Sequence, residues 1–153
     1  MKQLLVAGLL MVATSAQALE CRVVDPAQRF VYAEESASDV VIVMGEFDVV
    51  GNELPGCEGP GEVSYAMVSG HFVGQGLTQD GFTAAMAAPF LVRQDCMSPS
   101  PETVTLFSET NIVFLDVTDR GYLLSVGDCA SSVYPADPAT ISQLTACMRG
   151  ESC

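Results

Sequence analysis

The sequence predicts an all-β or β-rich α+β fold: a small barrel of about five or six strands with a short N-terminal helix, a C-terminal helix and stabilising disulfides. Three observations support this prediction. Runs of β-branched and aromatic residues are separated by turns rich in Gly, Pro and Asp. Glycines recur at alternate positions of one long run, which lets a strand coil sharply. Apolar residues adopt helical spacing near the C-terminus.

The first 18 residues have the organisation of a cleavable secretory signal. Lys2 provides the positive charge, Leu4–Val12 the apolar segment and Ala16–Ala18 an A-x-A cleavage pattern. The apolar segment is too short to span a membrane, which takes about 20 residues. Cleavage leaves residues 19–153 as a single domain, expected in the periplasm of a bacterium or secreted.

A lipid anchor at Cys21 is the alternative to a soluble exported chain. Glu20 precedes this cysteine, whereas a lipid-anchor site requires a small residue there. A membrane span further along is also disfavoured, because the apolar stretch Ala84–Val92 is short and contains Pro89. We therefore expect no stable membrane anchor.

The first elements of the mature chain are a helix and a strand. Asp25, followed directly by proline, is a helix N-cap, and the helix should run to about Glu35. Val40–Val50 begins with the sequence VVIVM, which is typical of a strand buried on both faces. Gly51–Gly61 contains two prolines and is expected to be a loop carrying Cys57.

The longest strands are expected to form a hairpin in the middle of the chain. Val63–Leu77 and Phe82–Arg93 are joined by the turn Thr78–Gly81. Three glycines share the strand face of Phe72 and would allow the first of these strands to coil. They are Gly70, Gly74 and Gly76.

Shorter strands and a helix complete the prediction. Cys96–Pro101 is a loop, and Thr118–Gly121 is a turn between the last two strands. The strands are Val104–Phe107, Ile112–Val117 and Tyr122–Val126. Asp137 caps a helix with Pro138 at its first position, and Gly150 stops it. Apolar residues at helical spacing fill this helix: Ile141, Leu144 and Met148.

Six cysteines remain after cleavage: Cys21, Cys57, Cys96, Cys129, Cys147 and Cys153. An even number in an exported chain indicates disulfides, with fifteen possible pairings that spacing does not resolve. A zinc site is disfavoured, because there is no C-x-x-C pair and His71 is the only histidine. Cys147 and Cys153 lie about one helical turn and a stop apart, which favours a local staple over a redox dithiol.

The charge balance restricts the partners. Lys2 is the only lysine, and the whole chain has a formal net charge of −13. Such a chain repels nucleic acid and anionic lipid, and a solvated acidic surface is its simplest interpretation. No cofactor is expected, because a phosphate-binding loop would need a lysine and no dinucleotide-binding glycine pattern follows a strand.

Candidate catalytic and metal-binding residues all have structural explanations. His71 lies near Ser64 and Ser69, but no G-x-S-x-G turn accompanies them, so a strand histidine is favoured over a triad. Glu34 and Glu35 are adjacent on the expected helix and would diverge rather than face one substrate. Acidic residues near the hairpins lack calcium-loop spacing. They are Asp80, Asp116, Asp119 and Asp128.

This pattern resembles the OB-fold of tissue inhibitors of metalloproteinases and related netrin-type modules. Cys21–Val43 is similar to the opening of that family: a cysteine, a proline-containing turn, a short helix and a Ser-Asp-Val-Val strand. Cys96 falls where the family places a cysteine after its third strand. Tyr122–Leu144 is similar to the last barrel strand, the following cysteine and the packing helix. The resemblance covers most of the mature chain and implies an OB-like barrel.

The resemblance also implies a disulfide scheme and a departure from the family's activity. Cys21 would bridge to Cys129, leaving Cys57 with Cys96 and Cys147 with Cys153. The inhibitors bind the protease zinc through a free N-terminal cysteine and open with a Cys-x-Cys pair. Here Leu19 and Glu20 precede Cys21, so the ligand amine is missing.

These observations favour an exported, non-enzymatic binding or accessory domain. The expected contact surface is the barrel face with the loops Gly51–Gly61 and Cys96–Pro101. The alternatives are a protease inhibitor acting through an exposed loop and a periplasmic hydrolase with a site assembled from scattered Asp, Glu and Ser residues. The partner, a protein among the options, and the oligomeric state stay open.

Overall fold

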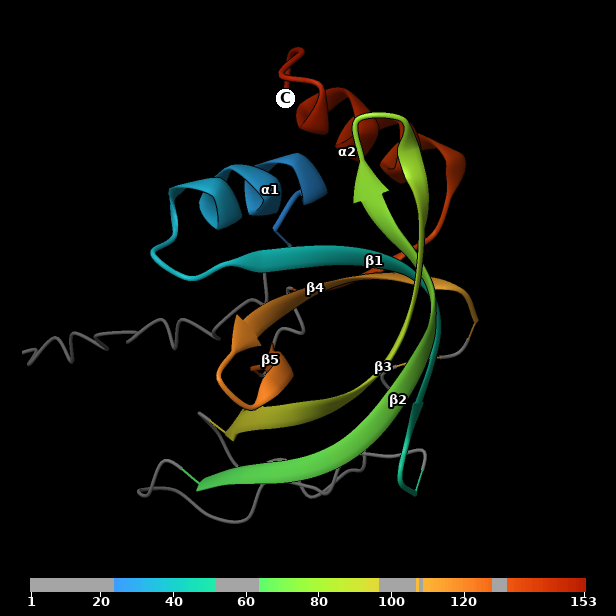
Figure 1. Cartoon of the computed structure of the whole chain (residues 1–153). Coiled ribbons are helices and arrows are strands. Elements are labelled where there is room, and N and C mark those ends of the chain that lie inside the picture. Colours follow the sequence, from blue (N-terminus) through green and yellow to red (C-terminus); the bar gives the residue numbers. More distant parts are fainter. Residues whose placement is uncertain (1–23, 52–63, 97–106, 108, 128–131) are drawn as a thin grey trace, which may run out of the picture.

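The computed structural model of the chain describes residues 24–51, 64–96, 107, 109–127 and 132–153 (Figure 1). Several sequence predictions fall wholly or largely outside these residues. They are the signal segment 1–18, the loops Gly51–Gly61 and Cys96–Pro101, the strand Val104–Phe107, and the cysteines Cys21, Cys57 and Cys129.

Both helices begin where the sequence predicts. Helix α1 is Pro26–Glu35, and the Asp25 carboxylate accepts a hydrogen bond of 2.9 Å from the amide of Ala27. Helix α2 is Pro138–Met148, capped in the same way by Asp137. Gly150 adopts a positive φ of 73°, which glycine reaches without strain, and ends α2.

In the described part of the chain, six strands form one sheet. They are β1 (Val40–Val49), β2 (Ser64–Thr78), β3 (Gly81–Cys96), β4 (Asn111–Thr118), β5 (Gly121–Val126) and β6 (Val133–Pro135). Their order is β1-β2-β3-β5-β4-β6, and β4 also pairs with β1, so the first five strands close into a ring. Strands β3 and β5 are parallel, while the other pairs are antiparallel.

The predicted β-rich, OB-like barrel with a helix near each end of the mature chain is therefore confirmed. Only β6 was not predicted. It has three residues and ends in Pro135, too short a run to give a strand pattern.

Glycines allow β1 and β2 to cross closely. Gly45 is paired with Gly74, and a Cβ atom at either would press on main-chain atoms of the opposite strand. A Cβ at Gly70 would lie 2.6 Å from the carbonyl oxygen of Asp48. Because each of these contacts is with backbone, only glycine fits, and β2 and β3 can curve along their length as Figure 1 shows.

The barrel interior is one hydrophobic core. Aromatic rings pack through its centre: Phe47 stacks on Phe72 with ring centroids 5.6 Å apart, and Tyr122 packs edge-on against Phe72 at 5.7 Å. Aliphatic residues complete it: Val43, Val49, Val92, Val113, Leu115, Leu124 and Val126.

A second core lies outside the barrel, between the wall and the two helices (Figure 1). It is built from the alternate residues of the same strands, since neighbouring strand residues point to opposite faces. Thus Val43 points into the barrel, while Ile42 packs beneath the helices. The helices contribute Ala27, Phe30, Leu144 and Cys147 to this outer core.

Candidate functional site

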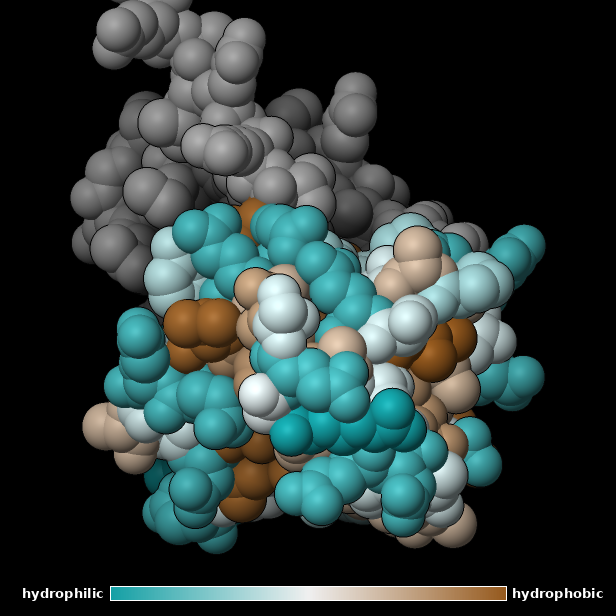
Figure 2. Space-filling model, turned by 90° about the horizontal axis from the view of Figure 1, so that it is seen from above, coloured by the Kyte–Doolittle hydropathy of each residue, from teal (hydrophilic) through white to brown (hydrophobic). Residues whose placement is uncertain are grey.

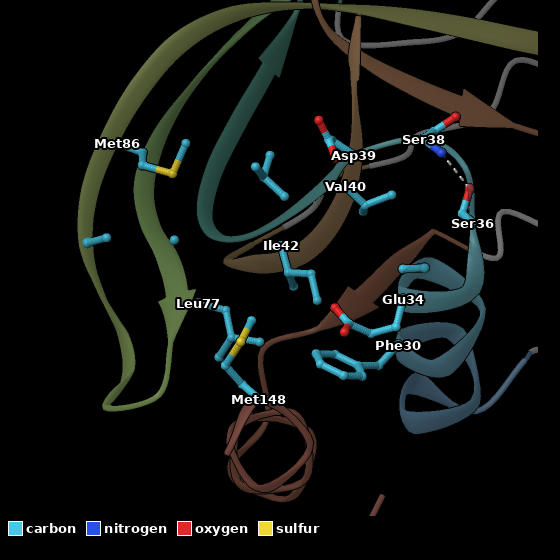
Figure 3. Close-up of a pocket in the computed structure, with 14 residues that line it drawn as sticks. Phe30, Glu34, Ser36, Ser38, Asp39, Val40, Ile42, Leu77, Met86 and Met148 are labelled. Atoms are coloured by element: carbon cyan, nitrogen blue, oxygen red, sulfur yellow. Dashed lines mark hydrogen bonds between the residues drawn. The ribbon is translucent and has the colours of Figure 1, made fainter. Parts of the chain in front are cut away.

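A groove opens at one edge of the outer core (Figure 3). Four separate parts of the chain line it: the end of α1, the start of β1, the β2–β3 hairpin and the end of α2. Its volume is about 340 Å³, near the lower end of the range for small-ligand sites, about 300–1,000 Å³.

The floor of the groove is apolar and rich in methionine. Phe30 and Ile42 are buried at its base. Leu77, Met86 and Met148 are half-buried and form the rest of the floor (Figure 3). Thioether side chains adapt their shape readily to different apolar guests. The floor therefore offers apolar surface that the protein itself leaves partly uncovered.

The groove exists because the pairing between β1 and β2 does not extend to the first residues of β1. The ladder between these strands ends at the pair Val43–Gly76, and the β2–β3 ladder has a register shift at the next step, between Gly76 and Leu77. A Cβ at Gly76 would lie 2.7 Å from the Met86 sulfur, so the missing side chain makes room for that thioether. Val40–Ile42 therefore form one wall of the groove and the hairpin forms the other.

Part of the backbone of β1 faces this opening. The amide of Val117 in β4 donates to the carbonyl oxygen of Asp39 at 2.8 Å, so Asp39 turns this group toward β4. Successive strand residues direct their backbone polar groups to opposite edges, and those of Val40 therefore face the groove. Among the described strands, none pairs with this edge of β1 at Val40.

The rim is polar and negatively charged. Glu34 extends from α1 at the groove, and Asp39 lies at the start of β1 (Figure 3). Ser36 and Ser38 lie between them, and the Ser38 amide donates to the Ser36 hydroxyl at 3.1 Å. The described residues that line the groove include no lysine, arginine or histidine.

The C-terminal segment connects the two walls of the groove. The Arg149 Nε donates to the carbonyl oxygen of Gln79 in the hairpin turn at 2.7 Å. On the other side, the Gln143 amide donates to the Asp25 carboxylate at 3.1 Å. Met148, on the groove floor, therefore lies in a helix that is attached both to the hairpin and to the N-cap of α1.

The disulfide between Cys147 and Cys153 belongs to the same connection. It encloses Met148 and Arg149, and the Cys153 sulfur lies 3.6 Å from the Ala27 carbonyl oxygen in α1. This is the local staple that the cysteine spacing predicted. The other two proposed pairs each include residues outside the described part of the chain.

The other predicted site residues do not converge on the groove. Of the two adjacent glutamates, Glu34 lines the groove and Glu35 does not. His71 is exposed on the outer face of β2, opposite Asp48 of β1 and Pro89 of β3. Among the described residues, no group of three His, Cys, Asp or Glu side chains is arranged to hold a metal ion.

Threonines supply the side-chain hydrogen bonds of both hairpin turns. The hydroxyl of Thr78 accepts from the Asp80 amide at 3.2 Å and donates to the Gly81 carbonyl at 2.9 Å. Thr118 makes the same pair of bonds in the next hairpin, to the Arg120 amide and the Gly121 carbonyl. The aspartates in these turns are thus placed by turn geometry.

The outer face of β1–β3 is the side on which OB barrels carry ligands. Its exposed side chains include Asp48, His71 and Val73, the last 59% exposed. The described aromatic side chains lie mainly inside the two cores.

Two other hollows, of about 520 and 400 Å³, share Glu109 and Thr110. Both are larger than the groove, but fewer described residues line them, five and six against fourteen for the groove. The groove has described residues on all its sides and is therefore the better-defined candidate.

Among the described residues, two titratable groups have shifted pKa values, and both shifts have structural causes. Burial raises the pKa of Tyr134, whose ring packs edge-on against Phe114 in the outer core. The amide and hydroxyl of Thr140 lower the pKa of Asp137 at the start of α2. Neither group lines the groove.

Comparison with protein-family models, curated proteins and solved structures found no match to this chain. Within the described residues, no helix is both long enough and apolar enough to cross a membrane. The groove must therefore be interpreted from its own chemistry.

Sequence reasoning did not find the groove. Its residues come from segments far apart in the chain, and each belongs to an element with an ordinary structural pattern. The glycine at position 76 was the one available signal, since glycine within a strand often marks a bulge or a close approach.

Proposed function

We propose that this chain is an exported, non-enzymatic binding or accessory domain that holds its ligand in the groove between α1, β1 and the β2–β3 hairpin. The observation that carries the proposal is the half-buried apolar floor of Leu77, Met86 and Met148 within a polar rim. Concave apolar surface with a few polar groups around it is the usual form of a ligand site.

The arrangement of titratable groups supports binding rather than catalysis. The rim carboxylates of Glu34 and Asp39 are solvent-exposed, and none of the described lining residues is a cysteine or a histidine. A hydrolase would bring a nucleophile or paired carboxylates to one point of the site. The kinship with netrin-type modules stays a hypothesis alongside this proposal.

The first test is fragment binding to the oxidised mature protein, followed by NMR of backbone amides. A library of neutral, cationic and anionic fragments should shift the amides of Val40–Val43 and of Gly76–Leu77. Ala84→Trp places a large ring in the groove and should abolish these shifts. Ala87→Trp is the matched control, because Ala87 is exposed on the same strand but does not line the groove.

Fragment shifts that scatter over the surface, or that persist in Ala84→Trp, would contradict the proposal. Turnover in a hydrolase substrate panel would replace it with the enzyme hypothesis. If the protein inhibits proteases and Ala84→Trp does not change that inhibition, the result would support a protease inhibitor that acts through an exposed loop.

A further inference from the structure

The groove combines three features that one kind of ligand would match. It has a strand edge, an apolar floor and a carboxylate rim. Resting on the proposed function of the groove, we infer that its occupant is an extended segment of a partner polypeptide that carries a large apolar side chain next to Lys or Arg. The segment adds to β1 as a short extra strand.

The strand edge selects a polypeptide. The backbone groups of Val40 face the groove, and the β1–β2 ladder ends at Val43. A free strand edge pairs with an extended peptide through backbone hydrogen bonds, which is a general mode of peptide recognition. A small apolar molecule would leave these backbone groups without such partners.

The apolar floor selects a large apolar side chain. Leu77, Met86 and Met148 are half-buried and line the groove together with the buried side chains of Ile42 and Phe30. A volume of about 340 Å³ suits one bulky side chain with its flanking backbone, and is too small for a helix presenting several anchors. Two methionines let the floor adapt to leucine-like or aromatic guests.

The negatively charged rim favours a positively charged residue next to that side chain. Glu34 and Asp39 lie on the helix and strand that border the opening, and no cationic side chain is among the described lining residues. The whole chain carries a net charge of −13, so an acidic segment would be repelled while it approaches. Seen from the helical side, the described surface is largely hydrophilic, and its hydrophobic residues are exposed in separate patches (Figure 2).

The test uses blocked five-residue peptides of the form Ser-X-Leu-X-Ser, in which X is lysine, serine or glutamate. When the lysine peptide is titrated, the NMR shift changes of the groove amides should reach saturation, and added salt should weaken binding. With serine, binding should be about fivefold weaker, and with glutamate it should be undetectable. Glu34→Gln should weaken the lysine peptide about two- to fivefold, whereas its neighbour Glu35→Gln should not.

N-methylation tests the strand addition. Only one edge of an extended peptide can face β1, so N-methylating one alternate set of amides should weaken binding about tenfold, while the other set is tolerated. A molecule that merely fills the apolar floor would respond equally to both sets.

Equal affinities for the lysine and serine peptides, or equal tolerance of both N-methylated sets, would overturn this inference. The fragment result distinguishes that failure from failure of the proposed function. Fragments that still map to the groove leave the binding site in place, whereas fragments and peptides that both miss it contradict both proposals.

Discussion

The barrel interior and the outer core are built on opposite faces of the same strands, but different elements enclose them. Phe72 and Leu124 inside the barrel are both 0% exposed, and a closed ring of strands surrounds them. The outer core is covered by two helices, and Leu77 and Met148 are half-buried where that cover ends. Two other lining residues of the groove, Val41 and Met86, pack against the interior core, so the groove lies where the two layers meet.

The two regions are also held together differently. Ladders of backbone hydrogen bonds close the ring around the interior. The walls of the groove are connected through α2 by individual contacts from Arg149 and Gln143 and by the disulfide staple. Because few contacts hold the outer layer, we expect it to open at a lower free energy than the barrel.

Truncating one buried leucine in each region is the strongest test of this comparison. Leu124 in the interior and Leu144 in α2 are both 0% exposed. Leu124→Ala should lower the free energy of unfolding by about 4–5 kcal/mol, because a closed ring cannot collapse onto the cavity. Leu144→Ala should cost about 2–3 kcal/mol, because a helix can shift to fill the space. Urea denaturation measures both, and equal losses would show that the outer layer is as rigid as the interior.

Two strand glycines give a second matched pair. Gly45→Ala sets a methyl group against the main chain of β2 and should destabilise the fold by about 3 kcal/mol. Gly76→Ala meets the flexible Met86 side chain instead, so stability should change by less than about 1 kcal/mol while fragment binding in the groove weakens. Thermal unfolding and fragment titration check the pair. Strong destabilisation by Gly76→Ala would mean that the floor of the groove cannot adapt.

Removing the staple tests the connection between the walls. The double variant Cys147→Ala, Cys153→Ala opens a loop with a sequence separation of 6 and should lose about 2 kcal/mol in the chain-entropy account. Hydrogen exchange should speed up at the end of α2 and leave the barrel strands unchanged. Faster exchange throughout the barrel would contradict the independence of the two layers.

Elements with local signals were predictable from the sequence. Asp25 and Asp137, each followed by proline, define both helix starts, and the Thr-to-Gly turns define both hairpins. The Cys147–Cys153 staple was predictable because its partners are close in sequence. In each case, residues within one or two turns of chain determine the geometry.

The groove was not predictable, because its geometry depends on where a ladder between distant segments ends. The last β1–β2 pair is Val43–Gly76, so none of the described strands pairs with this edge of β1 at Val40, and no residue pattern marks this endpoint. Met86 and Met148 line the same groove only because α2 packs on the hairpin. The same reasoning explains why β6, which depends on pairing with β4, was missed.

The smallest expected effect concerns the cap that begins α2 and is a pH-dependent test of the outer layer. The Asp137 carboxylate accepts hydrogen bonds from the amides of Ala139 and Thr140, which lower its pKa below the ordinary value. A carboxyl group whose pKa is lower in the folded chain than in the unfolded chain stabilises the fold. This stabilisation is complete at pH values above the pKa of the unfolded chain. That stability is lost as the pH falls through the folded pKa.

The difference in melting temperature between the native chain and Asp137→Ala should therefore be constant near neutral pH and fade below about pH 4. Asp137→Asn is the control, because an amide oxygen caps a helix without titrating, and its advantage over Asp137→Ala should persist in acid. The other carboxyl groups titrate in all three proteins and cancel in the comparison. A gap between the native chain and Asp137→Ala that stayed unchanged in acid would mean that the charge of Asp137 does not stabilise α2, and that only the neutral hydrogen bonds hold this end of the outer layer.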